Sequence, residues 1–482
     1  MPAPRSRGRA PDARSIAGSR SNGLSSHEAP PSRRAWQDRR RRRGLARPSG
    51  RGAAKWAGPG FGWRCRSAAL AARASERTLM KIDYRLVALL AALTALGPFS
   101  LQILAPALPV VARDLAVGAG AAQLLLSLSL AAMAVSTLVW GPLSDRMGRR
   151  PVILIGVGLA LLGSLIAALA PTLEIAVVGR LLQAGGAIAG MVLGRAIAYD
   201  LYGRDGAANV IGQITAVMVV APMMAPALSG FIVGVGEGGN WRGIFWAVAA
   251  LSAILLGAAA LRLPETAPGG RTGQGFGATL ADTLAGFREI AGLATFWAYA
   301  GYGVMSLSCF LFFVGAAPFV MQEAYGRGPI EYGLWFMLVA AAYMAANIAC
   351  GPVSRRLGGD WALRLGALLA IGGLAIAALL AVAGVLHPGA LIFPVMLQSV
   401  GAGLSVPNAM AGATAAVPER AGAASGLMGC CQFLAAGVAT QIAGLLPHDT
   451  ALPLSVCMVA MLTVGLALHL WLSGAVQRRV AG

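Results

Sequence analysis

Apolar stretches of about 20 residues recur from Leu86 to the end of the chain, separated by short polar breaks. This is the length that an α-helix needs to cross the hydrocarbon core of a bilayer, where only backbones that satisfy their own hydrogen bonds are stable. The pattern predicts an all-α membrane protein with twelve transmembrane helices, over residues 86–112, 120–142, 152–170, 173–199, 208–235, 243–262, 295–320, 331–352, 362–384, 389–416, 421–446 and 451–473.

Composition and loop charge support this prediction. The chain is 57% hydrophobic and 12% charged, which is too apolar for the surface of a soluble protein of this size. With the N-terminus inside, the cytoplasmic connections hold most loop arginines, whereas the opposite side holds only Arg113, Arg242 and Arg327. We therefore expect a multi-pass protein of the cytoplasmic (inner) membrane with both termini in the cytoplasm.

The helices divide into two sets of six. The longest break, residues 264–293, predicts a cytoplasmic linker whose amphipathic helix would bury Leu280, Leu284, Phe287 and Ala291 on one face. On either side, "GPLSDRMG" from Gly141 and "GPVSRRLG" from Gly351 are 351 − 141 = 210 residues apart. This repeat predicts two pseudo-symmetric six-helix bundles, residues 80–263 and 294–474, followed by a cytoplasmic tail, 475–482.

Residues 1–79 differ from the rest of the chain. They contain 19 basic and four acidic residues, a balance of 19 − 4 = +15 out of the formal total of +20. The segment has almost no apolar periodicity, so we expect a disordered basic tail that lies upstream of a working start at Met80. An arm that binds anionic lipid or RNA is the alternative. The other 403 residues carry a formal charge of only +5, which gives no reason to expect a nucleic-acid partner.

The chain offers no residue set for an enzyme, a metal site or a cofactor. Its six cysteines form no C-x-x-C pair, its four histidines are scattered, and no G-x-S-x-G occurs. Only two lysines are present, so the phosphate-binding loop that needs one is missing. We expect a protein that is not an enzyme and uses no ATP within this chain.

A charged loop follows the second predicted helix, with the pattern G-x-x-x-D-R-x-G-R-R formed by Gly141, Asp145, Arg146, Gly148, Arg149 and Arg150. It is similar to the loop signature of the major facilitator superfamily, whose members have twelve helices in two six-helix halves. The resemblance implies a conformational latch that joins the halves on the cytoplasmic side and opens during transport. A solvated orientation anchor is the alternative. Arg355 replaces Asp145 in the second copy, so that latch should be absent or reversed.

The fourth predicted helix carries Arg180 well inside the bilayer, where an unpaired guanidinium is unfavourable. With Gln183 it forms "RLLQAGG", similar to a superfamily element implicated in proton coupling. Arg195 and Asp200 resemble the R-A-x-x-x-D-L ending of the bicyclomycin and chloramphenicol resistance branch. The resemblance implies a proton-coupling role for these four residues; an Arg180 bonded only to carbonyls is the structural alternative.

The fifth predicted helix contains Pro222, Pro226 and Gly230 at intervals of four, in "APMMAPALSG". Prolines at this depth bend a helix. The segment is similar to the bend motif of superfamily antiporters. Together, these motifs resemble the Bcr/CflA-type drug:proton antiporters over residues 86–320.

One departure concerns the first helix, where Gln102 stands in place of an Asp that is common in that branch. Glutamine cannot carry a proton, so coupling through Asp200 beside Arg195, or uniport, remains. We expect a mostly neutral substrate site in a central cavity, with Gln102, Tyr299, Tyr302 and Asn408 as candidates; interhelical hydrogen bonding is the alternative for each.

These observations predict a monomeric secondary transporter in the lipid bilayer that exports small amphipathic drugs by proton-coupled alternating access. Export of a small metabolite, such as a sugar, amino acid or purine derivative, would require the same fold. A membrane-embedded enzyme or a non-transporting sensor would need catalytic groups or an output domain, and the sequence offers neither.

Overall fold

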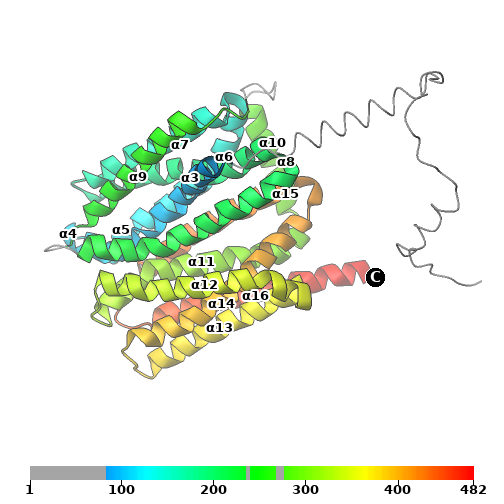
Figure 1. The fold of residues 1–482 in the computed structure, drawn as a ribbon. Helices are drawn as coiled ribbons and strands as arrows, with labels where there is room; N and C mark the ends of the chain where they lie inside the picture. Colours follow the sequence, from blue (N-terminus) through cyan, green and yellow to red (C-terminus); the bar gives the residue numbers. More distant parts are fainter. Residues whose placement is uncertain (1–82, 235–238, 268–275, 482) are drawn as a thin grey trace, which may run out of the picture. The chain divides into compact units, whose positions relative to one another are not determined.

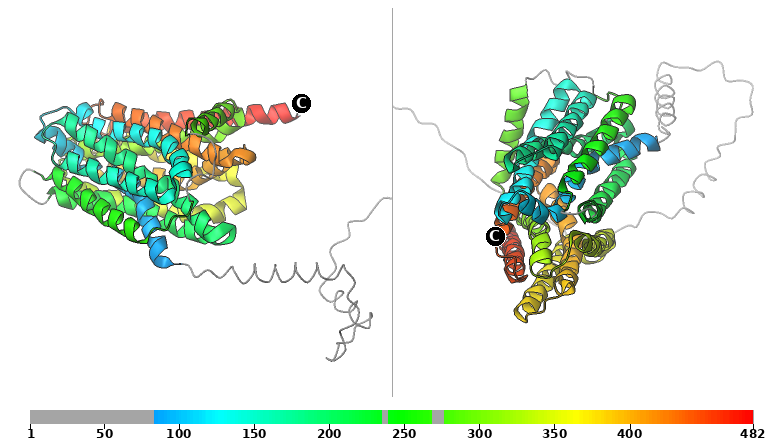
Figure 2. Two further views of the ribbon diagram at one scale, coloured as in Figure 1. Left: turned by 90° about the horizontal axis from the view of Figure 1, so that it is seen from above. Right: turned by 90° about the vertical axis from the view of Figure 1, so that its left-hand side faces the viewer.

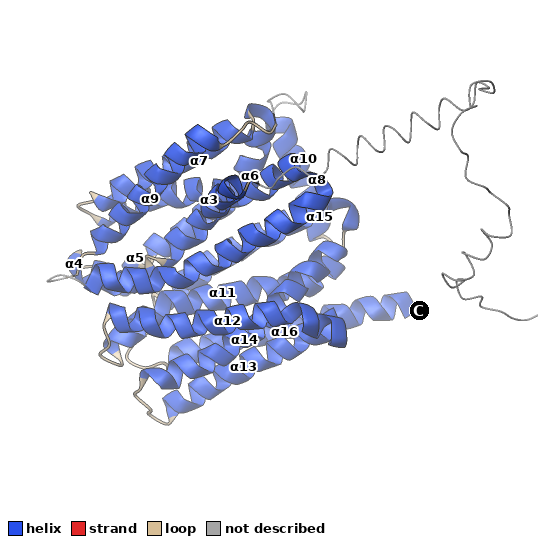
Figure 3. Ribbon diagram, in the orientation of Figure 1, coloured by secondary structure: helices blue, strands red, loops and turns tan. Residues whose placement is uncertain are grey.

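The structure, a computed structural model, describes residues 83–234, 239–267 and 276–481. The predicted tail, residues 1–79, lies outside the described residues. Within the described residues every regular element is helical (Figure 3). The elements, labelled in Figure 1, are α3 (Tyr84–Gln102), η1 (Ala105–Ala107), α4 (Leu108–Asp114), α5 (Ala119–Ala122), α6 (Leu124–Met147), α7 (Arg149–Ala168), α8 (Leu173–Gly234), α9 (Trp241–Arg262), α10 (Phe276–Ala291), α11 (Ala294–Glu323), α12 (Pro329–Leu357), α13 (Gly359–Val382), α14 (Pro388–Ala415), η2 (Pro418–Arg420), α15 (Ala421–Ala443) and α16 (Leu452–Ala481).

The prediction of twelve transmembrane helices is confirmed, because 12 helical spans of the described chain are long and apolar enough to cross a membrane. The first span, Tyr84–Asp114, combines α3, η1 and α4. Helix α8 supplies two spans, Leu173–Gly203 and Asn209–Gly234. They are separated at Gly203, whose φ of 64° is a left-handed value that a side chain would disfavour.

The two halves repeat the same glycine packing. Helix α7 packs on α8 in the first half, and α13 packs on α14 in the second. A Cβ atom on Gly163 would overlap the carbonyl oxygen of Gly179, and one on Gly373 would lie 2.5 Å from the carbonyl oxygen of Pro394. Gly163 and Gly373 are 373 − 163 = 210 residues apart, the spacing of the repeated loops. The duplication therefore extends from the loops into the packing of the bundles.

The halves meet mainly at one end of the bundle, where α8 packs on α12 and α6 packs on α15 (Figures 1 and 2). A Cβ on Gly230 would lie 2.5 Å from the carbonyl oxygen of Pro329, and one on Gly333 would lie 2.6 Å from that of Pro226. At the α6–α15 contact, Gln441 accepts a hydrogen bond from Ser127 at 2.7 Å and donates one to the Gly120 carbonyl at 2.8 Å. We call this the closed end, and the opposite end, where α6 and α12 terminate, the arginine end.

Helix α10 lies at the arginine end and contacts α6 of the first half as well as α15 and α11 of the second. Glu289 forms an ion pair of 2.9 Å with Arg420, and Ile290 is fully buried. The expected apolar face was partly wrong, because Leu284 is 47% exposed and Ala291 is also exposed. The side chain of Leu280 lies outside what the structure describes. The helix is turned so that Gly286 and Ile290 face the second half.

Glycine packing generates a first prediction, with a control on the same helix. Gly163→Ala should lower the free energy of unfolding by about 1–3 kcal/mol, because the new methyl overlaps the backbone of α8. Gly158→Ala, also on α7, should change it little or raise it, since nothing lies within 4 Å of its Cβ position. Thermal unfolding of the purified variants measures both. Equal Tm values for the two variants would contradict the packing argument.

The connection between α15 and α16 carries a buried titratable group, His448, at the closed end. Its ring stacks on Phe319 with centroids 5.0 Å apart and lies 3.1 Å, through Nε2, from the carbonyl oxygen of Ala443. Burial lowers the pKa of His448 below its ordinary value, outweighing the opposing effects of Glu323 and the Ala443 carbonyl. The folded protein therefore holds this imidazole in its neutral form more firmly than the unfolded chain does.

This lowered pKa predicts a direction of pH dependence. The unfolded chain binds a proton at His448 as the pH falls below about 6.5, before the folded chain does, so this contribution to stability is lost in that window. His448→Gln should therefore flatten the decline in Tm between about pH 7.5 and about pH 5.5. Thermal unfolding across this range gives the two slopes, and identical slopes would refute the assignment.

Candidate functional site: the carboxylate and arginine cluster

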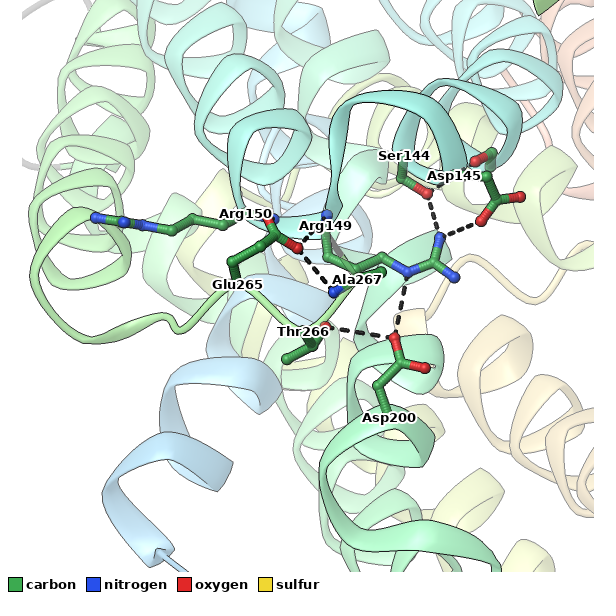
Figure 4. Close-up of polar contacts among 9 residues, drawn as sticks. Ser144, Asp145, Arg149, Arg150, Asp200, Glu265, Thr266 and Ala267 are labelled. Atoms are coloured by element: carbon green, nitrogen blue, oxygen red, sulfur yellow. Dashed lines mark hydrogen bonds and ion pairs between the residues drawn. The ribbon is translucent and has the colours of Figure 1, made fainter. Parts of the chain in front are cut away.

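The loop between α6 and α7 places Arg149 between two carboxylates (Figure 4). Its guanidinium donates to Asp145 Oδ1 at 2.8 Å through one terminal nitrogen and lies 3.4 Å from Asp200 Oδ2 through Nε. The same terminal nitrogen also contacts the Ser144 hydroxyl. The side chain of Asp145 remains 40% exposed, whereas that of Arg149 is 14% exposed. One guanidinium at the start of α7 thus joins the end of α6 to the end of the first span of α8, Leu173–Gly203.

Glu265, which the sequence analysis did not single out, holds the same loop from the other side (Figure 4). Its carboxylate accepts hydrogen bonds from the backbone N–H groups of Arg149 at 2.9 Å, Arg150 at 3.2 Å and Ala267 at 2.9 Å. The first two are N–H groups at the start of α7, which an acceptor stabilises. Gly148 has a φ of 97°, and a Cβ there would lie 2.5 Å from Glu265. The glycine of the motif is therefore required both for the turn and for the approach of Glu265.

The other predicted latch residues contribute less to this cluster. Arg150 donates to the Ala260 carbonyl at 2.7 Å, and Gly141 accepts from the Ser144 hydroxyl at 2.7 Å. Arg146 is exposed. The contacts of Arg149, with Ser144, Asp145 and Asp200, all join it to residues of the first half. In the second copy Arg355 is exposed, and no ion pair holds it in the part of the chain that is described.

Arg180 lies deep within the first half, with only 1% of its surface exposed. It donates to the carbonyl oxygens of Leu125 at 3.3 Å and Ser100 at 3.1 Å, and to the side chain of Gln183. Gln183 in turn donates to the Ser164 hydroxyl at 2.7 Å. These bonds join α3, α6, α7 and α8, which is the arrangement of the structural alternative. The structure brings no carboxylate to Arg180 among the described residues.

Asp200 and Arg195 are the two remaining proton-coupling candidates. Asp200 pairs with Arg149 and also accepts from the Thr266 hydroxyl at 3.3 Å. Arg195 is exposed. The structure therefore places Asp200 in the carboxylate and arginine cluster, through its ion pair with Arg149.

The helix-five residues lie at the contact between the halves. Pro226 and Gly230 are buried against the start of α12, and Pro222, one turn earlier, is half-buried. Because Gly230 lacks a side chain, the backbones of α8 and α12 can approach closely. In this structure the motif forms part of the α8–α12 contact at the closed end.

The substrate-binding candidates make contacts within a half. Tyr299 donates to Asp360 at 2.8 Å, Tyr302 to Ser405 at 3.1 Å, and Asn408 donates to the Leu404 carbonyl at 2.8 Å. Tyr302 is fully buried. Gln102 is 6% exposed, and its Oε1 accepts no hydrogen bond from the described residues. The bonds of the two tyrosines, and a bond of 3.0 Å that Asn408 accepts from Ser354 of α12, fit the alternative of interhelical hydrogen bonds. A substrate role for all four residues stays a prediction.

Residues 90–440 match the Major Facilitator Superfamily. The chain belongs to this family. Solved structures with the same fold include a D-xylose-proton symporter, 13% identical with a TM-score of 0.66 over 81% of this chain and 97% of that one. A bacterial homolog of the human lysosomal transporter Spinster is 16% identical, with a TM-score of 0.66 over 82% and 98%. The predicted major facilitator fold, with two six-helix halves, is confirmed.

Several relatives carry names from drug resistance. Multidrug resistance protein D of Escherichia coli (strain K12) is 30% identical over 383 residues, 79% of this chain and 93% of that protein. A chloramphenicol resistance protein of Pseudomonas aeruginosa is 31% identical over 79% and 89%. A bicyclomycin resistance protein homolog of Haemophilus influenzae is 26% identical over 82% and 97%. These relatives confirm the predicted branch of bicyclomycin and chloramphenicol resistance.

The cluster generates a prediction about Glu265. Glu265→Ala removes the acceptor for two N–H groups at the start of α7, so the free energy of unfolding should fall by about 0.5–2 kcal/mol. Glu419→Ala is the control, because that exposed glutamate accepts no hydrogen bond from the described residues. Thermal unfolding of both variants tests this. A loss no larger than that of the control would show that Glu265 does not stabilise the helix.

Proposed function

We propose that the protein exports small amphipathic drugs by proton-coupled alternating access, in which the closed end and the arginine end open in turn. The observation that carries the proposal is that hydrogen bonds of Arg113, Ser127 and Gln441 join the halves at the closed end, whereas Arg149 at the other end is paired with carboxylates of its own half. Membership of the superfamily and the names of the relatives support the choice of cargo.

The orientation follows from the charge distribution. We propose that the arginine end faces the cytoplasm, since it holds Arg146, Arg149, Arg150, Arg355 and Arg356. Both termini would then be cytoplasmic, the membrane would be the inner membrane, and the working unit a monomer. In this orientation the structure corresponds to the state whose outer end is shut.

The carboxylates of the cluster are the best candidates for the proton. Asp145 and Asp200 share one guanidinium, so neutralising either leaves Arg149 with a single carboxylate partner and changes what holds α6 and the first span of α8 together. Arg180 would instead keep the first half rigid through its carbonyl contacts. Gln102 cannot take part, because an amide side chain does not titrate.

Efflux from proteoliposomes with an imposed pH gradient tests the proposal, using chloramphenicol, bicyclomycin and a cationic dye as cargo. Asp200→Asn should reduce gradient-driven efflux by about tenfold or more, equivalent to about 1.4 kcal/mol. Asp282→Asn, at an exposed carboxylate on α10, is the control and should behave as wild type. No efflux of any compound, with transport of a labelled sugar, amino acid or purine derivative, would favour the metabolite exporter.

A further inference from the structure

The α6–α15 contact at the closed end contains a buried side-chain amide that takes no part in the hydrogen bonds between the halves. Gln123, which precedes α6, is fully buried. Neither its Nε2 nor its Oε1 has a hydrogen-bond partner among the described residues. A buried amide without partners loses its hydration and gains nothing in exchange. The closed end is therefore built around a group that is unfavourable there.

The hole that receives Gln123 is made by glycines of the other half. A Cβ on Gly444, at the end of α15, would lie 2.8 Å from Gln123 Cβ. A Cβ on Gly315 of α11 would overlap Gln123 Nε2, and it would also lie 3.0 Å from the methyl group of Thr440. Only glycine at these two positions leaves room for the side chain. Gln123 from the first half thus inserts between two helices of the second.

Gln123 differs from the other side-chain amides at this end because both of its amide atoms lack a hydrogen-bond partner. Gln441 uses its amide fully, accepting from Ser127 at 2.7 Å and donating to the Gly120 carbonyl at 2.8 Å. Gln322 accepts from Arg113 at 3.0 Å, also across the halves, and only its Nε2 lacks a partner among the described residues. The α8–α12 contact relies on glycines and backbone approach. Of the described residues at the seal, Gln123 combines complete burial, insertion across the halves and an amide with no partner at either atom.

We propose that Gln123 is the gating residue of the outer end, a positioning residue for transport that holds the shut state close in free energy to the open one. When the halves separate there, Gln123 leaves the Gly315 and Gly444 hole and its amide becomes hydrated. Its shape favours the shut state through packing, and its desolvation opposes that state. This inference rests on the proposed alternating access and on no assumption about the cargo or the proton.

Two substitutions should act in opposite directions. Gln123→Leu keeps a similar volume without the amide, so the ratio of outer-open to outer-shut molecules should fall about 5- to 100-fold, the factor that corresponds to the desolvation of one buried polar group. Gly315→Ala places a methyl against Gln123 and should raise that ratio. Gln123→Ala combined with Gly315→Ala should restore closure, because the shorter side chain vacates the space that the methyl needs.

The control is a buried amide inside one half. Gln398 on α14 is 1% exposed, and its Nε2 also has no partner among the described residues. Its surroundings belong to the second half, where Ser399 donates to its Oε1 at 3.3 Å and Gly373 lies against its backbone. Gln398→Leu removes the same kind of group from a place that does not separate. It should leave the ratio of the two states unchanged.

Spin-label distance distributions on the purified full chain in nanodiscs, without drug or pH gradient, measure this ratio. One label pair at Gly118 and Asp449 reports on the closed end, and a second at Met147 and Leu357 reports on the arginine end. Opposite shifts for Gln123→Leu and Gly315→Ala, with recovery in the double variant, support the gate. Equal distributions for Gln123→Leu, Gln398→Leu and wild type overturn it, even if efflux is normal. If the distance distributions shift as expected but no drug is exported, the gate stands and only the proposed cargo is wrong.

Discussion

Within a bilayer a polar group must find its partner in the protein, and the architecture depends on this constraint. Backbone groups are satisfied inside the long helices, and buried side chains use carbonyl oxygens of neighbouring helices. Arg180 is the strongest case, since its guanidinium joins α3 and α6 to α8. The glycine contacts bring helices close enough for such bonds to form. Each half is therefore a bundle held together from within.

The contact between the halves is different in kind. It consists of the α8–α12 and α6–α15 contacts and a few polar bonds, and part of it, around Gln123, is unfavourable. A molecule built from two bundles, each crosslinked by hydrogen bonds such as those of Arg180, separates most easily at the boundary between them. Large motion then leaves Arg180 and the α7–α8 packing undisturbed. This division of contacts is the physical basis for alternating access in the chain.

The sequence predicted features that depend on neighbouring residues better than contacts between residues far apart in the chain. The length of each apolar stretch is a local property, so the spans and the repeat at 210 residues could be read directly. Which face of a helix meets which neighbour could not, because helices that are apolar on all sides carry no periodic signal. For Tyr302 and Asn408 the sequence therefore left a cavity and interhelical bonding both open, and only the structure shows their bonds within the second half. Glu265 was missed since its partners, the first residues of α7, lie more than 100 positions earlier.

The duplicated loops show how geometry and charge can diverge. Gly148 and Gly358 both have positive φ and both begin a helix, so the backbone turn is kept in each half. The charges are exchanged: Arg355 stands at the position of Asp145, and Asp360 at that of Arg150, since 360 − 150 = 210. Asp360 accepts from Tyr299 and Asp145 pairs with Arg149, each within its own half, whereas Arg355 is exposed. Each loop still has more arginines than acids, with Asp145 against Arg146, Arg149 and Arg150 in the first and Asp360 against Arg355 and Arg356 in the second. Because like charges repel, the loops oppose a closing contact at this end, and an acid in either loop weakens that repulsion.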